Sequence, residues 1–110
     1  MATTGDFVKY GQDYGMISGV HDLHGQQMFG FVCCKSSSER YQKLVPMDGV
    51  TLIDDDNERA IAIKSAKDFF KNEYKNCLFM TKYLKKTKQT KLLVSYEKAL
   101  PYYKQWLNKF

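Results

Sequence analysis

The stretch TGDFVKYGQDYGMISGV, residues 4–20, places glycines at positions 5, 11, 15 and 19 among residues that otherwise favour β-strands. Isolated glycines inside strands usually mark bulges or corners, where a sheet must bend sharply. Further short strand-like runs follow as far as Ile53, each separated from the next by a turn signal, and another isolated glycine lies at position 30. We therefore expect a small barrel or strongly bent sheet of about five short strands in this half of the chain.

The dipeptide Asp48-Gly49 joins the runs YQKLVPM and GVTLI. Glycine accepts the positive φ that the tight turn of a β-hairpin demands, so this dipeptide predicts such a turn. The segment HDLHGQ, residues 21–26, lies between two other strand-like runs and predicts a loop.

The hydrophobic period changes within the stretch IDDDNERAIAIKSAKDFF, residues 53–70. Ser65, with Asp68 three residues later, resembles a capping box, in which the serine oxygen accepts a hydrogen bond from an amide at the start of a helix. We predict a helix over residues 66–85. One arc of its surface, roughly 80° wide, is expected to pack on the barrel. The residues of this arc are Ala66, Phe70, Tyr74, Cys77, Thr81 and Leu84.

The end of the chain is less regular. The segment KKTKQTK, residues 85–91, predicts a polar and basic connection, and LLVSY, residues 92–96, fits either a strand or the start of another helix. Pro101 suits the first position of a helix. A short terminal helix that begins there, held by Trp106, is therefore expected.

A chain of 110 residues has the size of one ordinary domain. We expect an α+β fold in a single domain, residues 1–110, with a β-barrel part at 1–60 and a basic helical part at 61–110 packed on it. No apolar run approaches the roughly 20 residues that span a bilayer, and no signal peptide is evident. Three cysteines are too few for a disulfide framework, so we expect a cytoplasmic protein without a membrane partner.

Charge is divided unequally between the two parts. Residues 1–60 hold five Lys and Arg against nine Asp and Glu, whereas residues 61–110 hold twelve Lys against three acids. The formal net charges are therefore −4 and +9. Such asymmetry favours an anionic partner for the second part, whether nucleic acid, membrane surface or acidic protein.

Lysines of the second part are the candidate site for nucleic acid. Several of them share one arc of the predicted helix, beside its apolar face, and others follow in the connection. Lysine neutralises phosphate without choosing a sequence, whereas bidentate base reading is chiefly the work of arginine, of which the chain has two. We expect sequence-independent binding, with DNA favoured over RNA. The candidate residues are Lys64, Lys67, Lys71, Lys75, Lys82, Lys85, Lys86, Lys88 and Lys91.

Aromatic residues are interleaved with these lysines. Exposed aromatic rings can stack on the bases of a single strand, but aromatic residues more often belong to a core. We interpret the set mainly as core. Its members are Phe69, Phe70, Tyr74, Phe79, Tyr83, Tyr102, Tyr103 and Trp106.

Other chemistry-bearing groups do not form a convincing site. His21 and His24 could join a cysteine at a zinc ion, but Cys33 and Cys34 are adjacent on a predicted strand and point to opposite faces. A fourth ligand would require Cys77 to fold back onto the loop. Three consecutive acids, 54–56, suit a turn better than a two-metal nuclease, and three serines, 36–38, lack the frame of a catalytic nucleophile. We predict no metal, no cofactor and no enzymatic activity.

The opening stretch resembles a known family. Gly5-Asp6-x-Val8 followed by Gly15-x-Ile17-x-x-Val20 is similar to the first strands of the KOW or Tudor-type SH3-like barrel module. The resemblance extends loosely to about Asp56. It implies a five-stranded barrel that ribosomal, transcription and phage-encoded proteins use to contact nucleic acid or RNA polymerase. The acidic charge of this half departs from a barrel that itself binds nucleic acid.

Two functions follow as hypotheses. The first is a noncatalytic protein that binds DNA through its lysine-rich helical face, similar in organisation to phage host-takeover proteins that modulate host transcription or the nucleoid. The second is an interaction module that docks on a polymerase, ribosome or host defence protein through its acidic residues. These residues are Asp13, Asp22, Asp54, Asp55, Asp56 and Glu58.

Overall fold

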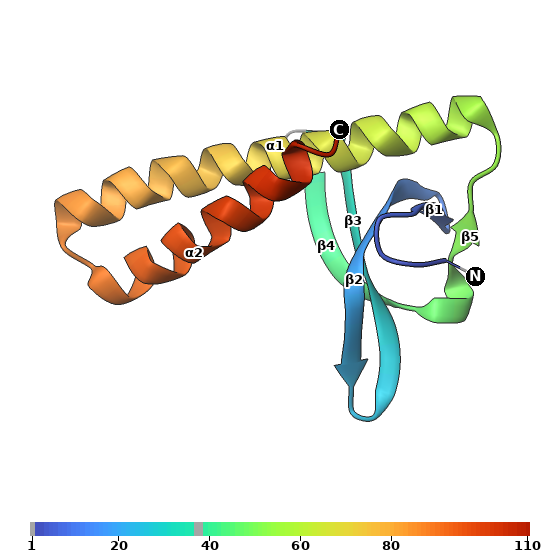
Figure 1. Cartoon of the computed structure of the whole chain (residues 1–110), viewed down its shortest axis with the longest axis horizontal. Coiled ribbons are helices and arrows are strands. Elements are labelled where there is room, and N and C mark those ends of the chain that lie inside the picture. The colour runs from blue at the N-terminus through green and yellow to red at the C-terminus, as the bar shows by residue number, and fades with distance from the viewer. Residues whose placement is uncertain (1, 37–38) are drawn as a thin grey trace. The chain divides into compact units, whose positions relative to one another are not determined.

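The structure of the chain is a computed structural model that describes residues 2–36 and 39–110. Five strands precede two long helices, which confirms the predicted α+β class (Figure 1). The elements in chain order are β1 (Phe7–Tyr10), β2 (Asp13–Leu23), β3 (Gln26–Ser36), β4 (Glu39–Pro46), the short 3-10 helix η1 (Met47–Gly49), β5 (Thr51–Leu52), α1 (Asp56–Thr87) and α2 (Thr90–Leu107).

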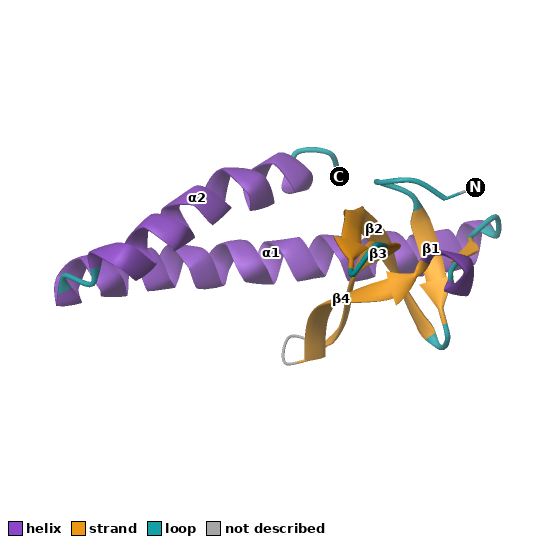
Figure 2. Ribbon diagram, turned by 90° about the horizontal axis from the view of Figure 1, so that it is seen from below, coloured by secondary structure: helices purple, strands orange, loops and turns teal. Residues whose placement is uncertain are grey.

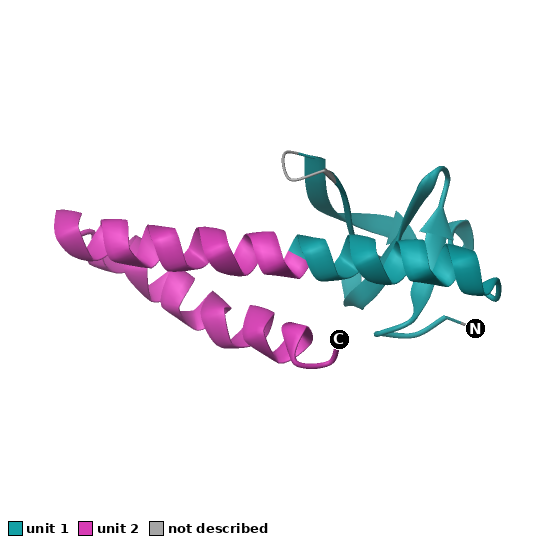
Figure 3. Ribbon diagram, turned by 90° about the horizontal axis from the view of Figure 1, so that it is seen from above, with its two compact units in different colours: residues 1–69 teal, residues 70–110 magenta. Residues whose placement is uncertain are grey.

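The chain divides into two compact units, residues 1–69 and residues 70–110, which Figure 3 shows in different colours. Helix α1 contributes its first part to one unit and its remainder to the other. The expected boundary between a β part and a helical part at residue 60 thus falls inside α1, since this helix begins at Asp56. We describe each unit by itself.

The strands of the 1–69 unit form one antiparallel sheet in the order β4-β3-β2-β1-β5. Figure 2 shows the strands in orange. An irregularity of the kind predicted at isolated glycines is present in the β2–β3 pair, where the register shifts between Ile17 and Gly19, and Gly19 lies opposite Gly30. Gly15 has a different role, because a Cβ atom at this position would lie against the carbonyl oxygen of Val32. Glycine there allows two strands to approach closely.

One face of the sheet carries the hydrophobic core of this unit. Phe29, Phe31 and Cys33 alternate along β3, as the period of a strand requires, and all three are buried. They pack with residues of three other strands. The buried cluster consists of Val8, Ile17, Phe29, Phe31, Cys33 and Val45.

The two expected turns differ in outcome. The loop predicted at residues 21–26 is shorter than expected, because β2 extends to Leu23 and β3 begins at Gln26. The two residues between them, His24 and Gly25, both have positive φ, 52° and 84°, as the two-residue turn of a β-hairpin requires. The tight turn predicted at Asp48-Gly49 is wrong, because these residues belong to η1 and Gly49 is not among the glycines with positive φ. The strands on either side of η1 pair with different partners, β4 with β3 and β5 with β1, so no hairpin turn is needed.

The first part of α1 is fixed to the sheet by hydrogen bonds. The Ser65 hydroxyl accepts from the Cys34 amide at 2.8 Å and lies 3.3 Å from the Cys34 carbonyl oxygen, to which it donates. The Tyr14 hydroxyl donates to Glu58 at 3.2 Å. The predicted capping role of Ser65 is therefore wrong, since the helix begins at Asp56 and this serine faces a strand from the helix interior.

In the 70–110 unit, the remainder of α1 and α2 form a helical hairpin. The predicted apolar arc is largely confirmed here, since Phe70, Cys77, Thr81 and Leu84 are all buried. In this unit Phe70 of the arc packs on Tyr103 and Trp106 of α2. The segment 92–96, for which the sequence left open a strand or a helix, belongs to α2.

Helix α2 begins at Thr90 and continues through Pro101, so the predicted helix start at this proline is wrong. Proline lacks the N–H that would bond to the carbonyl of Glu97. Pro101 and Glu97 are both exposed, and the Glu97 carbonyl can therefore bond to water instead. The proline is therefore tolerated on the outer side of the helix.

Candidate nucleic-acid interface

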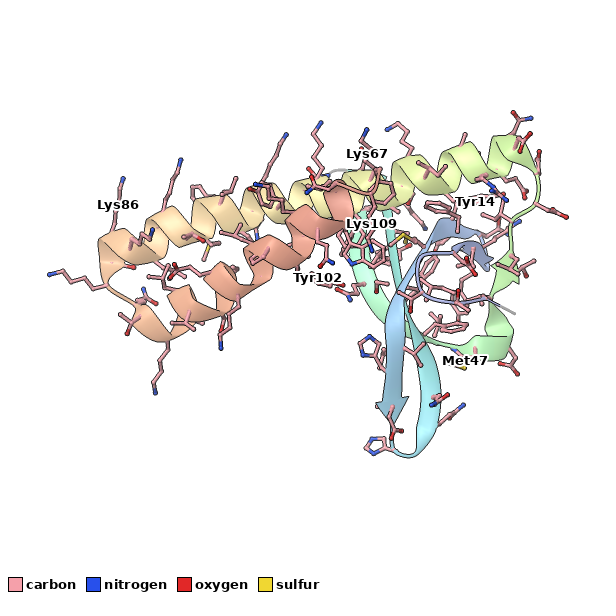
Figure 4. All side chains as sticks on the ribbon, viewed as in Figure 1. Tyr14, Met47, Lys67, Lys86, Tyr102 and Lys109 are labelled. Carbon is pink, nitrogen blue, oxygen red and sulfur yellow. The ribbon has the colours of Figure 1, made fainter. Side chains whose placement is uncertain are left out.

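All nine lysines of the predicted site are exposed. The two units divide them: Lys64 and Lys67 belong to residues 1–69, and the other seven belong to residues 70–110. Lys67 points away from the sheet of its own unit (Figure 4). The seven lysines of the second unit are Lys71, Lys75, Lys82, Lys85, Lys86, Lys88 and Lys91.

Five of these seven lysines share one side of α1. At about 100° per residue, they fall within roughly 100° of arc on the helix surface. Figure 4 shows one of them, Lys86, projecting from α1 on the side away from α2. We call this set the lysine face; its members are Lys71, Lys75, Lys82, Lys85 and Lys86. Helical geometry therefore gathers five positive charges beside the buried arc that contains Phe70 and Leu84.

The lysine face has little opposing charge within its own unit. Residues 70–110 contain ten lysines and two glutamates, a formal net charge of +8, whereas residues 1–69 carry a net charge of −3. Within the described residues, none of the ion pairs involves a lysine of the 70–110 unit. These ammonium groups are therefore available to an anion from outside.

Lys64 differs from the lysine face. Its ammonium group lies 2.8 Å from the Asp68 carboxylate, one helical turn further along α1. The hydrogen bond from Lys64 to Asp68, together with the opposite charge, raises the pKa of Lys64. A phosphate at Lys64 would compete with this carboxylate, so we place the stronger attraction in the other unit.

The helix connection contributes Lys88, and the first turn of α2 contributes Lys91. The connection is shorter than the predicted segment 85–91, because α1 ends at Thr87 and α2 begins at Thr90. Lys88 adopts the left-handed conformation, with φ of 58°, which reverses the chain direction. The Gln89 amide then donates to the Leu84 carbonyl oxygen at 3.2 Å, which satisfies one of the last carbonyls of α1.

The aromatic set divides into core and surface residues. Phe69 and Phe70 are buried, and Tyr74, Tyr103 and Trp106 are partly buried. Three aromatic residues predicted mainly as core are instead exposed: Phe79, Tyr83 and Tyr102. The signal was present in the sequence, because Phe79 and Tyr83 lie outside the predicted apolar arc of the helix.

The residues considered for metal or catalysis are not brought together. Cys33 is in the sheet core, where burial raises the pKa of its thiol to about 11, while Cys77 is buried in the helical hairpin. His21 is exposed on β2 and His24 occupies the hairpin turn. In the part of the chain that the structure describes, no group of three or more His, Cys, Asp or Glu could hold a metal ion.

The run of three acids, 54–56, leads into the start of α1, and the run of three serines, 36–38, is described only in part. Asp55 accepts a hydrogen bond from the Asn57 amide at 3.2 Å, and Asp56 begins α1, so the acidic run forms the turn and helix start before the basic segment. Acids are favoured there by the helix dipole. In the serine run, Ser37 and Ser38 lie outside the described residues.

No helix among residues 2–36 and 39–110 has the length and apolar character needed to cross a bilayer. Comparisons with protein-family models, with curated protein sequences and with solved structures found no match to this chain. The case for a function therefore depends on the residues and geometry described above.

Proposed function

We propose that this protein binds nucleic acid without enzymatic activity or sequence preference, and that DNA is preferred over RNA. The lysine face of α1 is the binding surface, with Lys88 and Lys91 beside it. Lys67 and Lys64 lie on the same helix in the other unit and contribute secondarily. The single observation that carries this proposal is the set of exposed lysines on one side of α1, in a unit of net charge +8.

The composition of the 70–110 unit favours phosphate contact over base reading. Both arginines of the chain, Arg40 and Arg59, lie outside this unit, and bidentate recognition of base edges is chiefly performed by arginine. Lysine contributes a point charge that neutralises phosphate of any sequence. The expected binding is therefore electrostatic and strongly dependent on salt.

The 1–69 unit is proposed to be an SH3-like barrel of the KOW or Tudor type. Two features support this. The last strand returns to pair with the first, with Val8 opposite Leu52, and a 3-10 helix connects β4 to β5. Its net charge of −3 disfavours phosphate contact by the strands of this unit. We further propose a cytoplasmic phage-type role, in which the protein modulates host transcription or the nucleoid.

A salt titration of binding tests the proposal. If about five phosphates are contacted, the slope of log K against log salt should be near −4 to −5 for duplex DNA. Anisotropy of a fluorescein-labelled 20-base-pair duplex, measured between 50 and 200 mM NaCl, gives this slope. An absence of binding to both duplex and single-stranded DNA at 50 mM, or a slope near zero, overturns the proposal.

Matched charge variants locate the surface. Replacing Lys75 and Lys82 by Gln should reduce the magnitude of the slope by about two, because each lost phosphate contact removes about one. The control replaces Lys98 and Lys104, two exposed lysines of α2 in the same unit, and changes the net charge equally. Equal losses in both variants would show that overall charge, and not the lysine face, attracts DNA.

A protein-docking function is the second candidate, and a specific observation favours it. Val20 and Leu23 on β2 and Leu44 on β4 are large apolar residues that remain at least 40% exposed on the sheet. Val20 shares one face of β2 with Asp22, so these two residues could meet an apolar and basic surface on a partner. Affinity capture whose yield survives nuclease treatment and falls on Val20→Ser/Leu23→Ser would support this function.

A further inference from the structure

Two large aromatic side chains on α1 remain exposed although a buried aromatic core lies on the same helix. Phe79 is 66% exposed and Tyr83 is 49% exposed, whereas Phe70 is fully buried. Packing within the unit therefore accounts for Phe70 but not for these two rings. An exposed pair of this kind requires an explanation other than the core.

The two rings are neighbours on the helix surface. Phe79 and Tyr83 are four residues apart, which places them one above the other with a rise of about 6 Å along the axis. Each ring can therefore meet a different residue or base of an extended ligand. The pair forms a short aromatic row on one side of α1.

The lysine face borders this aromatic row. Lys75 and Lys82 are four and three residues from Phe79, and Lys86 is three residues from Tyr83, so each is a surface neighbour of a ring. No acidic residue occurs between residues 74 and 96, so the part of α1 that carries the row contains no carboxylate to oppose an anionic ligand. The ligand that fits is polyanionic and carries planar apolar groups.

We propose that Phe79 and Tyr83 stack on the bases of a single strand, so that the lysine face binds single-stranded DNA in preference to duplex DNA. This inference rests on the proposed function. In a duplex the faces of the bases are covered by neighbouring bases, so only phosphates and base edges are accessible to the helix. In a single strand the base faces are open, and stacking on an aromatic side chain adds to phosphate neutralisation without regard to sequence.

Charge distinguishes a nucleic acid from a second copy of this chain as the occupant of the row. A second copy of this chain would bring its own unit of charge +8 against the same lysines, and the repulsion disfavours a dimer through this side. A single strand supplies both the negative charge and the planar groups that the row can contact. Charge complementarity therefore selects the nucleic acid as the occupant.

The test compares single-stranded and duplex DNA. Anisotropy is measured with fluorescein-labelled oligo(dT) of 20 nucleotides and with a 20-base-pair duplex, at 100 mM NaCl. Phe79→Ala and Tyr83→Ala should each weaken the binding of oligo(dT) about fivefold or more, while the affinity for the duplex changes less than twofold. Phe79→Tyr and Tyr83→Phe keep an aromatic ring and should retain the wild-type affinity.

The control is Leu92→Ala together with Val94→Ala, two exposed apolar residues of the same unit. This variant should bind both DNAs as the wild type does. Circular dichroism at 222 nm confirms that every variant keeps its helices. An equal loss of oligo(dT) and duplex binding in Phe79→Ala, or no loss at all, overturns the stacking inference.

Further outcomes separate this inference from the proposed function. If Lys75→Gln/Lys82→Gln loses both DNAs while the aromatic variants lose neither, the lysine face binds DNA and the stacking inference fails alone. If the wild type binds neither DNA, both fail. Sedimentation velocity and flotation with phosphatidylserine vesicles address the other occupants: self-association or vesicle binding that Phe79→Ala abolishes, without an effect on oligo(dT), assigns the row to a second copy or to a membrane and overturns the inference.

Discussion

The ring of Phe70 on α1 stacks on the indole of Trp106 on α2, with centroids 5.6 Å apart and planes 16° from parallel. Phe70 also lies near Tyr103 and Phe110, with centroid distances of 6.2 and 6.3 Å. These contacts join the two helices of the 70–110 unit far along the chain from their connection at Lys88 and Gln89. The hairpin is therefore closed at both ends, by a short connection and by an aromatic cluster.

Phe70→Ala should destabilise the protein by about 3 to 5 kcal/mol, because it removes a fully buried aromatic ring and leaves a cavity among its neighbours. Chemical denaturation followed by circular dichroism at 222 nm measures this loss. Phe79→Ala is the matched control on the same helix and should change the free energy of unfolding by less than about 0.5 kcal/mol, since that ring is largely exposed. Equal effects of the two substitutions would contradict the assignment of core and surface.

Ser65→Ala should cost about 1 to 3 kcal/mol, because the Cys34 amide would lose the acceptor that lies 2.8 Å away. The residue pairs between β2 and β3 end at Met16 with Val32, two residues before Cys34 on β3. Beyond that end, the Ser65 hydroxyl supplies the acceptor for the Cys34 amide. Urea denaturation measures the change, with Ser95→Ala, at an exposed position of α2, as the control. In addition, the Cys34 amide should exchange slowly with deuterium in the wild type and faster in Ser65→Ala.

The register of α1 was predictable from the sequence, but its start was not. Residues 70, 77, 81 and 84 fall on one arc by helical geometry alone, and all are buried. Ser65 and Asp68 have the spacing of a capping box, yet the same spacing suits a serine that turns toward a neighbouring strand. Only the tertiary contact with Cys34 distinguishes the two roles, and a local pattern does not contain it.

The candidate site was predictable in composition and less so in arrangement. Lysines at helical spacing were expected to be exposed, and the nine lysines are exposed. Their division between two units was not expected, and neither was the pairing of Lys64 with Asp68. The exposure of Phe79 and Tyr83 was missed because an aromatic residue favours burial by default, whereas the position on the helix decides which rings the core can reach.

Gly15→Ala should destabilise the 1–69 unit by about 1 to 3 kcal/mol, because the new methyl group would overlap the Val32 carbonyl oxygen and force the two strands apart. Gly19→Ala is the matched control on the same strand. Its nearest heavy atom outside its chain neighbours would be His21 Nε2, at an ordinary contact distance of 3.5 Å. Thermal unfolding should therefore show a clearly lower Tm for Gly15→Ala than for Gly19→Ala. Similar Tm values would mean that β2 and β3 are not so close at Gly15.

Asp13 should make the stability of the protein fall in acid. Its carboxylate accepts a hydrogen bond from the Tyr41 hydroxyl at 2.8 Å, and the ammonium groups of Lys35 and Lys43 lie 3.1 and 3.8 Å away. Burial alone would raise the pKa of Asp13, but the hydrogen bonds from Tyr41 and Lys35 and the two positive charges together hold it below its ordinary value of 3.8. The ionised form is therefore favoured more in the folded state than in the unfolded state.

The pKa of Asp13 is lower in the folded state than in the unfolded state. The contribution of Asp13 to the free energy of unfolding is therefore complete above about pH 5 and is lost as the pH falls through about 4 and below. Asp13→Asn removes this dependence, so the wild type should be more stable than the variant at pH 7, and the difference should shrink steadily towards pH 2.5. Urea denaturation at pH 7, 5, 4, 3 and 2.5 measures both curves. Asp22→Asn, at an exposed carboxylate on the same strand, is the control for the loss of one negative charge. A difference between wild type and Asp13→Asn that is constant over this range would show that the Tyr41 and lysine contacts do not favour the carboxylate.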